Sequence, residues 1–223
     1  MGLEAWAVCY RLWPKSVCCG MVELQSLQSA AEHVRGLTAA KQARGAAAPI
    51  IVGITGPVGA GKSTLARLLS EAVLSTDDYL PDYEQVDEDQ RDEPEHLDWE
   101  LLAHHLAELR AGRAAAVPVW SFQTHRRASF RAVEAGDVVV LEGIHALHRR
   151  IAEALDLRIF VEAPAGVRWA RWEHLELTGQ RGWGVEKAKS FFDGVAEPTF
   201  AKRAAGYRAA ADVVVINTGK LRL

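Results

Sequence analysis

Short apolar runs alternate along the chain with stretches in which apolar residues recur at helical spacing. A run that is apolar at nearly every position is typical of a strand buried on both faces. We expect such strands at 50–55, 72–76, 137–141, 157–161 and 212–217. The helical spacing predicts helices at about 62–70, 98–110, 149–155, 165–177 and 185–208. Strands that alternate with helices predict an α/β fold, a doubly wound parallel sheet flanked by helices.

The first 48 residues differ from the rest and form a predicted N-terminal extension. Apolar residues recur there at helical spacing, which predicts an amphipathic helix through Leu27, Ala30, Ala31, Val34 and Leu37. The stretch Gly-Ala-Ala-Ala-Pro at 45–49 then interrupts the chain. We therefore expect an extension over 1–48 and one α/β domain over 49–223.

The length and net charge of the chain favour a single domain without a nucleic-acid or membrane partner. A chain of 223 residues is long enough for one α/β domain with a substantial core and short for two. The net charge is −3, and the basic residues are scattered among the acids, which disfavours a nucleic-acid partner. No apolar run approaches the length of a signal peptide or a membrane span, so we expect no membrane partner.

The three cysteines all lie near the start of the chain, at Cys9, Cys18 and Cys19. No His or Cys partner there completes a zinc pattern, and no other thiol is present to pair with them. A reducing, cytoplasmic setting is the simplest interpretation. Met21 follows this stretch, and we hypothesise that it is an alternative start of translation.

A phosphate-binding motif lies between the first predicted strand and the next helix. The segment GPVGAGKS from Gly56 to Ser63 matches the pattern G-x-x-x-x-G-K-[ST]. Its glycines allow backbone N–H groups to turn toward phosphate oxygens at a helix N-terminus. Lys62 is expected to reach the β- and γ-phosphates, and the Ser63 hydroxyl to bind Mg²⁺. The motif predicts a P-loop NTPase fold with ATP and Mg²⁺ as cofactors, bound by Gly56, Gly59, Ala60, Gly61, Lys62, Ser63 and Thr64.

Two carboxylates follow buried strands, at the sheet edge where α/β proteins bind ligands. Glu142 ends the apolar run 138–141, and we expect it to hold Mg²⁺ directly or through water. Asp77 follows the predicted strand 72–76, where it can accept a proton from an attacking hydroxyl or help to hold Mg²⁺. The alternatives are a solvent-exposed acid at the strand end for Glu142 and an ordinary turn acid for Asp77.

From about residue 50 to 219, the chain resembles the uridine kinase family of P-loop kinases, which is related to phosphoribulokinase and bacterial-type pantothenate kinase. The matching segments occur in the family's order. They are GPVGAGKS, TDDY, DEP followed by LDWELLAHHLAELRAG, VPVWSFQTHRR, VVVLEGI, IFVEAP, QRG, EPTF and ADVVVINTG. The resemblance implies a small-molecule kinase that uses ATP and has a small lid.

The resemblance also implies roles for individual residues. Asp77 would be the catalytic carboxylate, acting with Lys62, Arg171 and Arg181. Substrate binding would fall to Asp92 on the ribose hydroxyls, to Trp120, Phe122 and His125 around the base, and to Arg127. Strand alternation places Trp120 and Phe122 on one face, so both line the acceptor site or both pack in the core. A solvated loop histidine is the alternative for His125.

The predicted lid, at 168–183, departs from the family. Arg171 and Arg181 remain, but the second arginine of each family pair has become Trp172 or Trp183. The family's Arg-Asp pair aligns with Leu175-Glu176, its later glutamine with Phe191, and its second Tyr after the acidic tip with Leu80. An arginine at developing charge accelerates phosphoryl transfer by several powers of ten. Arg168, one helical turn before Arg171, is a candidate to compensate.

Three functions remain open. The first is a kinase that phosphorylates the 5′-hydroxyl of uridine or cytidine. The second is a kinase of another small alcohol, such as pantothenate, a sugar or a glycerate. The third is an ATP-binding regulatory protein with weak transfer activity. A homo-oligomer is compatible with all three.

Overall fold

A computed structural model describes residues 21–45 and 48–219. Its centre is a parallel sheet in the order β1-β8-β7-β2-β6-β3. The strands are β1 (Val22–Leu24), β2 (Ile50–Thr55), β3 (Val73–Ser75), β6 (Val138–Glu142), β7 (Leu157–Glu162) and β8 (Val213–Ile216). The five strands predicted from apolar runs are confirmed, and every residue of the central strand β2 is buried. The three cysteines lie outside the described residues.

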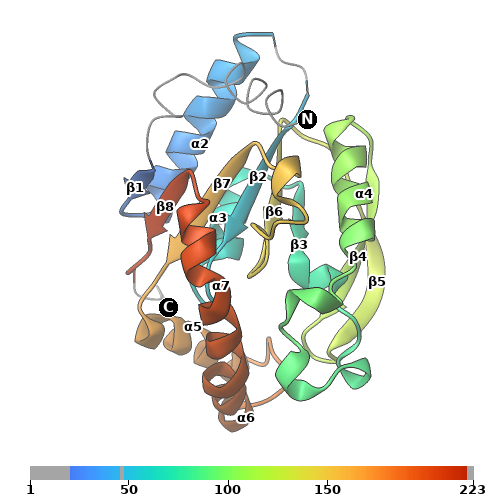
Figure 1. The fold of residues 1–223 in the computed structure, drawn as a ribbon, viewed down its shortest axis with the longest axis vertical. Coiled ribbons are helices and arrows are strands. Elements are labelled where there is room, and N and C mark those ends of the chain that lie inside the picture. The colour runs from blue at the N-terminus through green and yellow to red at the C-terminus, as the bar shows by residue number, and fades with distance from the viewer. Residues whose placement is uncertain (1–20, 46–47, 220–223) are drawn as a thin grey trace.

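Helices cover both faces of this sheet, which confirms the doubly wound α/β fold (Figure 1). On one face lie α2 (Leu27–Gln42) and α3 (Lys62–Leu69); on the other lie α4 (Trp99–Arg110) and α7 (Glu197–Ala209). Alternate residues of β2 serve the two cores, with Ile51 on the α4 side and Val52 on the α2 side. No helix within 21–45 or 48–219 is both long and apolar enough to cross a membrane.

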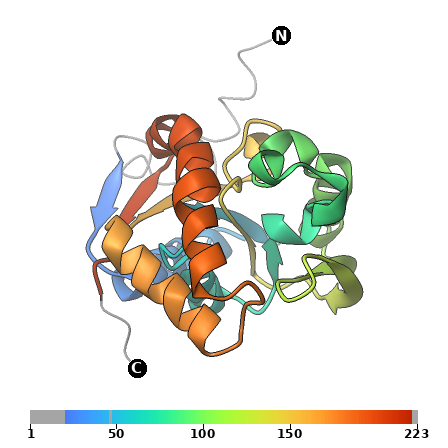
Figure 2. The ribbon, with the colours of Figure 1, turned by 90° about the horizontal axis from the view of Figure 1, so that it is seen from below.

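Two further helices, α5 (Ala165–Leu177) and α6 (Val185–Phe191), lie beyond the carboxyl ends of the strands (Figure 1). Figure 2 shows α5 and α7 gathered on one side of the molecule, with the segment that follows β3 on the other. The carboxyl edge of the sheet lies between these two groups, and it is there that the predicted site residues collect.

The segment before residue 49 contributes to both the sheet and the core. The predicted amphipathic helix is confirmed as α2, and Ser26 caps it by accepting a hydrogen bond from the Ser29 N–H at 3.0 Å. The short strand β1 was not expected; it pairs in parallel with β8 and extends the sheet edge. The division of the chain at residue 48 stays a prediction.

Two predicted helices are wrong in extent. The segment 149–155 holds a single 3₁₀ turn, Ala152–Ala154, since so short a segment gains few helical hydrogen bonds. The predicted helix 185–208 is divided into α6 and α7 by a π-helical stretch, Phe192–Ala196. Pro198 follows at the start of α7 and lacks the N–H that regular helical bonding there requires, which accounts for the irregularity.

A β-hairpin stands apart from the main sheet. It consists of β4 (Ala115–Ser121), expected as an extended segment, and β5 (Arg126–Val133), which was not predicted. Seven of the eight residues of β5 are exposed or only partly buried, so no apolar alternation marks it as a strand. A bulge between Val119 and Trp120 shifts the register of the hairpin.

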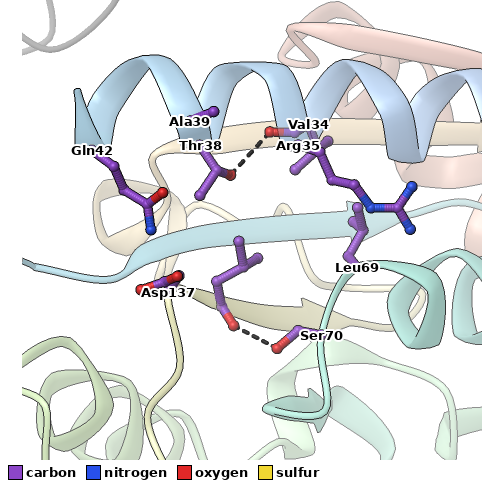
Figure 3. Close-up of a pocket in the computed structure, with 9 residues that line it drawn as sticks. Val34, Arg35, Thr38, Ala39, Gln42, Leu69, Ser70 and Asp137 are labelled. Atoms are coloured by element: carbon purple, nitrogen blue, oxygen red, sulfur yellow. Dashed lines mark hydrogen bonds between the residues drawn. The ribbon is translucent and has the colours of Figure 1, made fainter.

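The opposite edge of the sheet, away from the phosphate-binding loop, carries a shallow hollow of about 280 Å³ between α2 and the start of β6 (Figure 3). Its polar groups are largely engaged locally. The Ser70 hydroxyl donates to the Val138 carbonyl at 2.5 Å, and the Thr38 hydroxyl donates to the Val34 carbonyl at 2.9 Å. The predicted catalytic and binding residues lie at the carboxyl edge instead.

Candidate active site

The phosphate-binding loop joins β2 to α3 and depends on its glycines. Gly56, Gly59 and Gly61 have φ values of 151°, 74° and 104°, in the region that L side chains rarely adopt. A Cβ on Gly56 would lie 2.2 Å from the Val161 carbonyl oxygen, and one on Gly59 would lie 2.5 Å from that of Arg168. The loop therefore requires glycine at these positions, and it presents the N-terminus of α3 to an anion.

Lys62, Ser63 and Glu142 lie together at the base of this loop. The Ser63 hydroxyl donates to Glu142 Oε1 at 3.0 Å, and Lys62 Nζ donates to the Pro57 carbonyl at 3.0 Å. Glu142 is only 8% exposed, so the alternative of a solvent-exposed acid is wrong. Burial raises the pKa of Glu142, and the Lys62 ammonium partly opposes that rise. Thr64, also predicted to bind the nucleotide, lies on the first turn of α3 with an exposed side chain.

The hydroxyl of Ser63, the carboxylate of Glu142 and the hydroxyl of Thr76 are oxygen ligands of the kind that Mg²⁺ prefers. Thr76 Oγ1 is buried without a hydrogen-bond partner, close enough to Gly143 that a Cβ there would lie 1.8 Å from it. Within 21–45 and 48–219, no cluster of three His, Cys, Asp or Glu side chains could hold a metal alone. Mg²⁺ is usually bound by one or two carboxylates together with phosphates and water, and this donor set matches that pattern.

Asp77 lines a pocket of about 70 Å³ beside the phosphate-binding loop. It lies on the 3₁₀ turn Thr76–Tyr79 that follows β3. The other lining residues come from the phosphate-binding loop, the loop after β3, the hairpin tip, the loop after β6, the lid and α6. They are Val58, Leu80, Tyr83, Asp92, Phe122, His125, Ile144, Trp172, Glu176, Arg181, Trp183 and Phe191. The structure thus places Asp77, Asp92, Phe122, His125 and Arg181 around one space.

Both aspartates in this pocket have raised pKa values. Burial raises the pKa of Asp92 to about 7, with a further contribution from the Asp77 carboxylate, while a hydrogen bond with Tyr83 opposes the rise. Burial also raises the pKa of Asp77, and Lys62 and Arg181 act in the opposite direction. Two carboxyl groups with raised pKa values that line one pocket are typical of functional sites.

Aromatic rings form one wall of the pocket. His125 stacks on Trp183 at a centroid distance of 4.6 Å and on Tyr83 at 5.4 Å. The Arg181 guanidinium lies 3.6 Å from the centroid of Phe122. His125 therefore lies partly buried between rings from the lid and the acidic loop, and its contact with a substrate stays a prediction. Tyr83 carries no sequence signal beyond being an aromatic residue in an acidic loop.

Trp120 does not line the pocket and requires a correction. Its side chain is 5% exposed and packs behind Tyr83, with the two rings 5.1 Å apart. Its backbone N–H donates to Asp78 Oδ1 at 2.9 Å. Because β4 ends at Ser121, Phe122 lies in the hairpin turn, where strand alternation no longer applies, and Phe122 reaches the pocket while Trp120 does not.

Arg127 also lies outside the pocket lining. Its guanidinium donates to the carbonyl oxygens of Leu80 at 3.1 Å and Tyr79 at 2.9 Å. Arg127 thereby ties the hairpin to the turn that carries Asp77. Arg127 therefore supports the turn next to the predicted substrate site but does not line the pocket.

The lid arginines have separate partners. Arg171 donates to the carbonyl oxygens of Gly59 at 2.8 Å and Ala60 at 3.1 Å, which holds α5 against the phosphate-binding loop. Arg168 forms a two-pronged ion pair with Glu197, at 2.5 and 2.6 Å, so its charge is already matched within the fold. Among the described residues that line the pocket, Arg181 alone carries a guanidinium or ammonium group.

Tryptophans occupy the lid positions where the family has its second arginines. Trp172 Nε1 donates to Glu176 Oε1 at 3.1 Å. The other oxygen of Glu176 accepts hydrogen bonds from the backbone N–H groups of Trp183 at 3.2 Å and Gly184 at 3.0 Å. Trp172 and Trp183 thus replace arginine charge with a fixed aromatic surface, organised around one buried carboxylate.

Comparison with known proteins agrees with this geometry. The model of the "Phosphoribulokinase / Uridine kinase family" matches residues 51–220. A uridine kinase from Clostridium novyi is 30% identical over 186 residues, covering 77% of this chain and 89% of that protein. A chloroplastic uridine/cytidine kinase from Arabidopsis thaliana is also 30% identical, over 77% of this chain, but the chain spans only 38% of that protein's length.

A solved structure from Silicibacter sp. TM1040, provisionally named as a fructose transport system kinase, has a TM-score of 0.59 and 21% identity. The alignment covers 76% of this chain and 90% of that one. At this identity the likeness concerns the fold alone, and it matches the P-loop kinase architecture described above.

Proposed function

The chain belongs to the phosphoribulokinase/uridine kinase family, and from that premise we propose that it transfers the γ-phosphoryl group of ATP to the 5′-hydroxyl of uridine or cytidine. The observation that carries the proposal is the position of Asp77. Its carboxylate lines the pocket that holds Asp92, and it interacts electrostatically with Lys62 of the phosphate-binding loop. It therefore lies where a bound nucleotide and a hydroxylated acceptor would meet.

In the proposed reaction, backbone N–H groups of the loop and Lys62 hold the phosphates, and Asp77 accepts the proton of the attacking hydroxyl. A bond forms between the acceptor oxygen and the γ-phosphorus, the bond to the β-phosphate oxygen breaks, and ADP leaves. Mg²⁺ held by Ser63 and Glu142 would neutralise phosphate charge. The raised pKa of Asp77 suits a base, because a carboxylate with a higher pKa accepts a proton more readily.

Arg181 is proposed to stabilise the charge that develops on the transferring group. Its guanidinium interacts electrostatically with Asp77 and packs on Phe122. Arg171 is proposed to act less directly, since its hydrogen bonds go to the backbone of the phosphate-binding loop. With this assignment, only one lid arginine stabilises the charge of the transition state. We therefore expect slower phosphoryl transfer than in a kinase whose lid has several such arginines.

The pocket favours an uncharged acceptor. Its lining carries three carboxyl groups, of Asp77, Asp92 and Glu176, which are negative when ionised, against the single guanidinium of Arg181. An anionic alcohol such as pantothenate or a glycerate would be repelled by this balance. The lining is rich in aromatic residues, which favours an acceptor with a ring that can pack against them, so a pyrimidine nucleoside is favoured over a free sugar. Asp92, with Tyr83 beside it, is proposed to bind the vicinal ribose hydroxyls.

The proposal is tested by measuring ADP release from ATP and Mg²⁺ with a panel of acceptors. Uridine and cytidine should stimulate release, whereas 5′-deoxyuridine, which lacks the attacked hydroxyl, should not. Pantothenate, fructose and glycerate complete the panel. If only one of these three compounds stimulates ADP release, the acceptor is that alcohol and not a nucleoside. ATP binding without stimulation by any acceptor would favour the regulatory function.

A further inference from the structure

His145 is a buried histidine that neither the sequence motifs nor the proposed chemistry uses. It lies in the turn after β6, three residues beyond Glu142, and is 1% exposed. Its Nε2 lies 2.6 Å from the backbone carbonyl oxygen of Asp92, and its Nδ1 lies 3.0 Å from the hydroxyl of Tyr207 on α7. One imidazole ring therefore connects the turn after β6, the acidic loop and α7.

The partners of this ring determine which nitrogen carries the proton. A backbone carbonyl can only accept a hydrogen bond, so His145 must donate from Nε2. In a neutral imidazole Nδ1 is then an acceptor, and the Tyr207 hydroxyl donates to it. Burial lowers the pKa of His145 to about 4, which is consistent with a neutral ring. Each polar atom of this buried pair thus has a partner of the complementary kind.

The residue after Asp92 is anchored to the same helix. Glu93 is buried and forms ion pairs with Arg203, at 2.7 Å, and with Lys202. Arg203 and Tyr207 lie four residues apart on α7 and so share one face of it. The backbone around Asp92 is therefore held at two adjacent residues, while the rest of the acidic loop is largely exposed.

On the basis of the proposed function, we infer that His145 is a positioning residue for the acceptor. Through its Nε2–H it fixes the peptide of Asp92, and so directs the Asp92 carboxylate into the acceptor pocket. Tyr207 fixes the tautomer that makes this contact. The hydrogen bonds of His145 go to Asp92 and Tyr207 and not to the phosphate-binding loop or Asp77, so its contribution should fall on acceptor binding and not on nucleotide binding or the transfer step.

Steady-state kinetics of two substitutions test this role. His145→Leu removes the donor, whereas His145→Gln keeps an amide N–H near the position of Nε2. We expect His145→Leu to raise the KM for uridine by about two- to tenfold, the range for one lost buried hydrogen bond, with little change in kcat or in the KM for ATP. The preference for uridine over 2′-deoxyuridine should also weaken. His145→Gln should restore most of both losses.

His148→Leu is the matched control, since His148 lies in the same segment and stacks on Trp99 instead of contacting Asp92. It should leave the KM for uridine unchanged. Equal rises in the KM for ATP and for uridine in folded His145→Leu, or no rescue by a folded His145→Gln, would overturn the positioning role.

The tautomer of His145 can be determined by NMR, independently of any enzyme assay. A long-range ¹H–¹⁵N spectrum of the wild-type protein, with the His145 signals assigned from the Gln variant, should show protonation at Nε2. Protonation at Nδ1 would overturn the inference even if uridine is phosphorylated. If no nucleoside in the acceptor panel stimulates ADP release, the proposed function is wrong. The spectrum then still tests the hydrogen bond from His145 Nε2 to the Asp92 carbonyl.

Discussion

Replacing Asp92 by Asn should make the protein more stable at neutral pH while weakening acceptor binding. Asp92 has a pKa raised from 3.8 to about 7 by burial and by the neighbouring Asp77 carboxylate. At neutral pH the folded protein therefore either keeps a proton on Asp92 that the unfolded chain has released, or holds an unfavourable charge. An amide of the same shape removes that cost and can still bond to Tyr83.

The direction of the pH dependence follows from proton binding. Between about pH 4 and pH 7 the folded state binds more protons at Asp92 than the unfolded state does, so wild-type stability falls as pH rises through this window. A tenfold change in proton affinity is worth about 1.4 kcal/mol, so the full rise in pKa would correspond to about 4 kcal/mol. Because the Asp92 side chain is partly exposed, solvent screening reduces this to about 1–2 kcal/mol.

Thermal unfolding of wild type and Asp92→Asn from pH 4 to pH 8 checks this. For a protein of this size, 1–2 kcal/mol corresponds to a rise in Tm of about 2–8 °C. We expect the variant to gain this much relative to wild type by pH 8 and little at pH 4. Asp89→Asn, an exposed acid of the same loop, is the control and should show no such gain. A difference in Tm between Asp92→Asn and wild type that does not change with pH would refute the reasoning.

Four further substitutions separate the parts of the site. Lys62→Ala should abolish ATP turnover with an unchanged circular dichroism spectrum, because Lys62 acts on the phosphates; normal turnover in a folded variant would remove it from the site. Asp77→Asn should bind ATP normally in calorimetry and lose about 10²–10⁴-fold in transfer rate, whereas an equal loss of nucleotide affinity would make Asp77 chiefly a metal ligand. Trp120→Ala should lower the free energy of unfolding by about 3–5 kcal/mol in denaturant titration. Trp183→Ala should instead raise the KM for uridine about tenfold to a hundredfold, and the reverse assignment of these two effects would show that Trp120 is the stacking residue.

The fold was largely predictable because its strands are buried on both faces. Runs such as 138–141 are apolar at each position only if both sides of the sheet are covered, and this indicates the doubly wound architecture directly. The phosphate-binding loop was predictable for a related reason. Gly56 and Gly59 adopt backbone angles and close contacts that only glycine tolerates, so the motif records the geometry itself.

The acceptor side was less predictable because it depends on irregular structure. Trp120 and Phe122 do not share a face because β4 ends at Ser121 and Phe122 lies in the hairpin turn, an end point that no residue pattern marks. Tyr83 and Trp183 reach the pocket from a loop and from the lid, where neither period-2 nor period-3.6 spacing applies. The buried contact of His145 joins segments 53 residues apart in the chain, and only the folded structure brings them together.

The most direct test of the account is to identify the product formed from ATP and uridine by mass spectrometry and ³¹P NMR. We predict uridine 5′-monophosphate and ADP in equal amounts from the wild-type protein, and almost none from an Asp77→Asn variant that still binds ATP. Absence of a phosphorylated nucleoside from the wild-type reaction, or equal yield from Asp77→Asn, would contradict the proposal that Asp77 brings nucleotide and acceptor together.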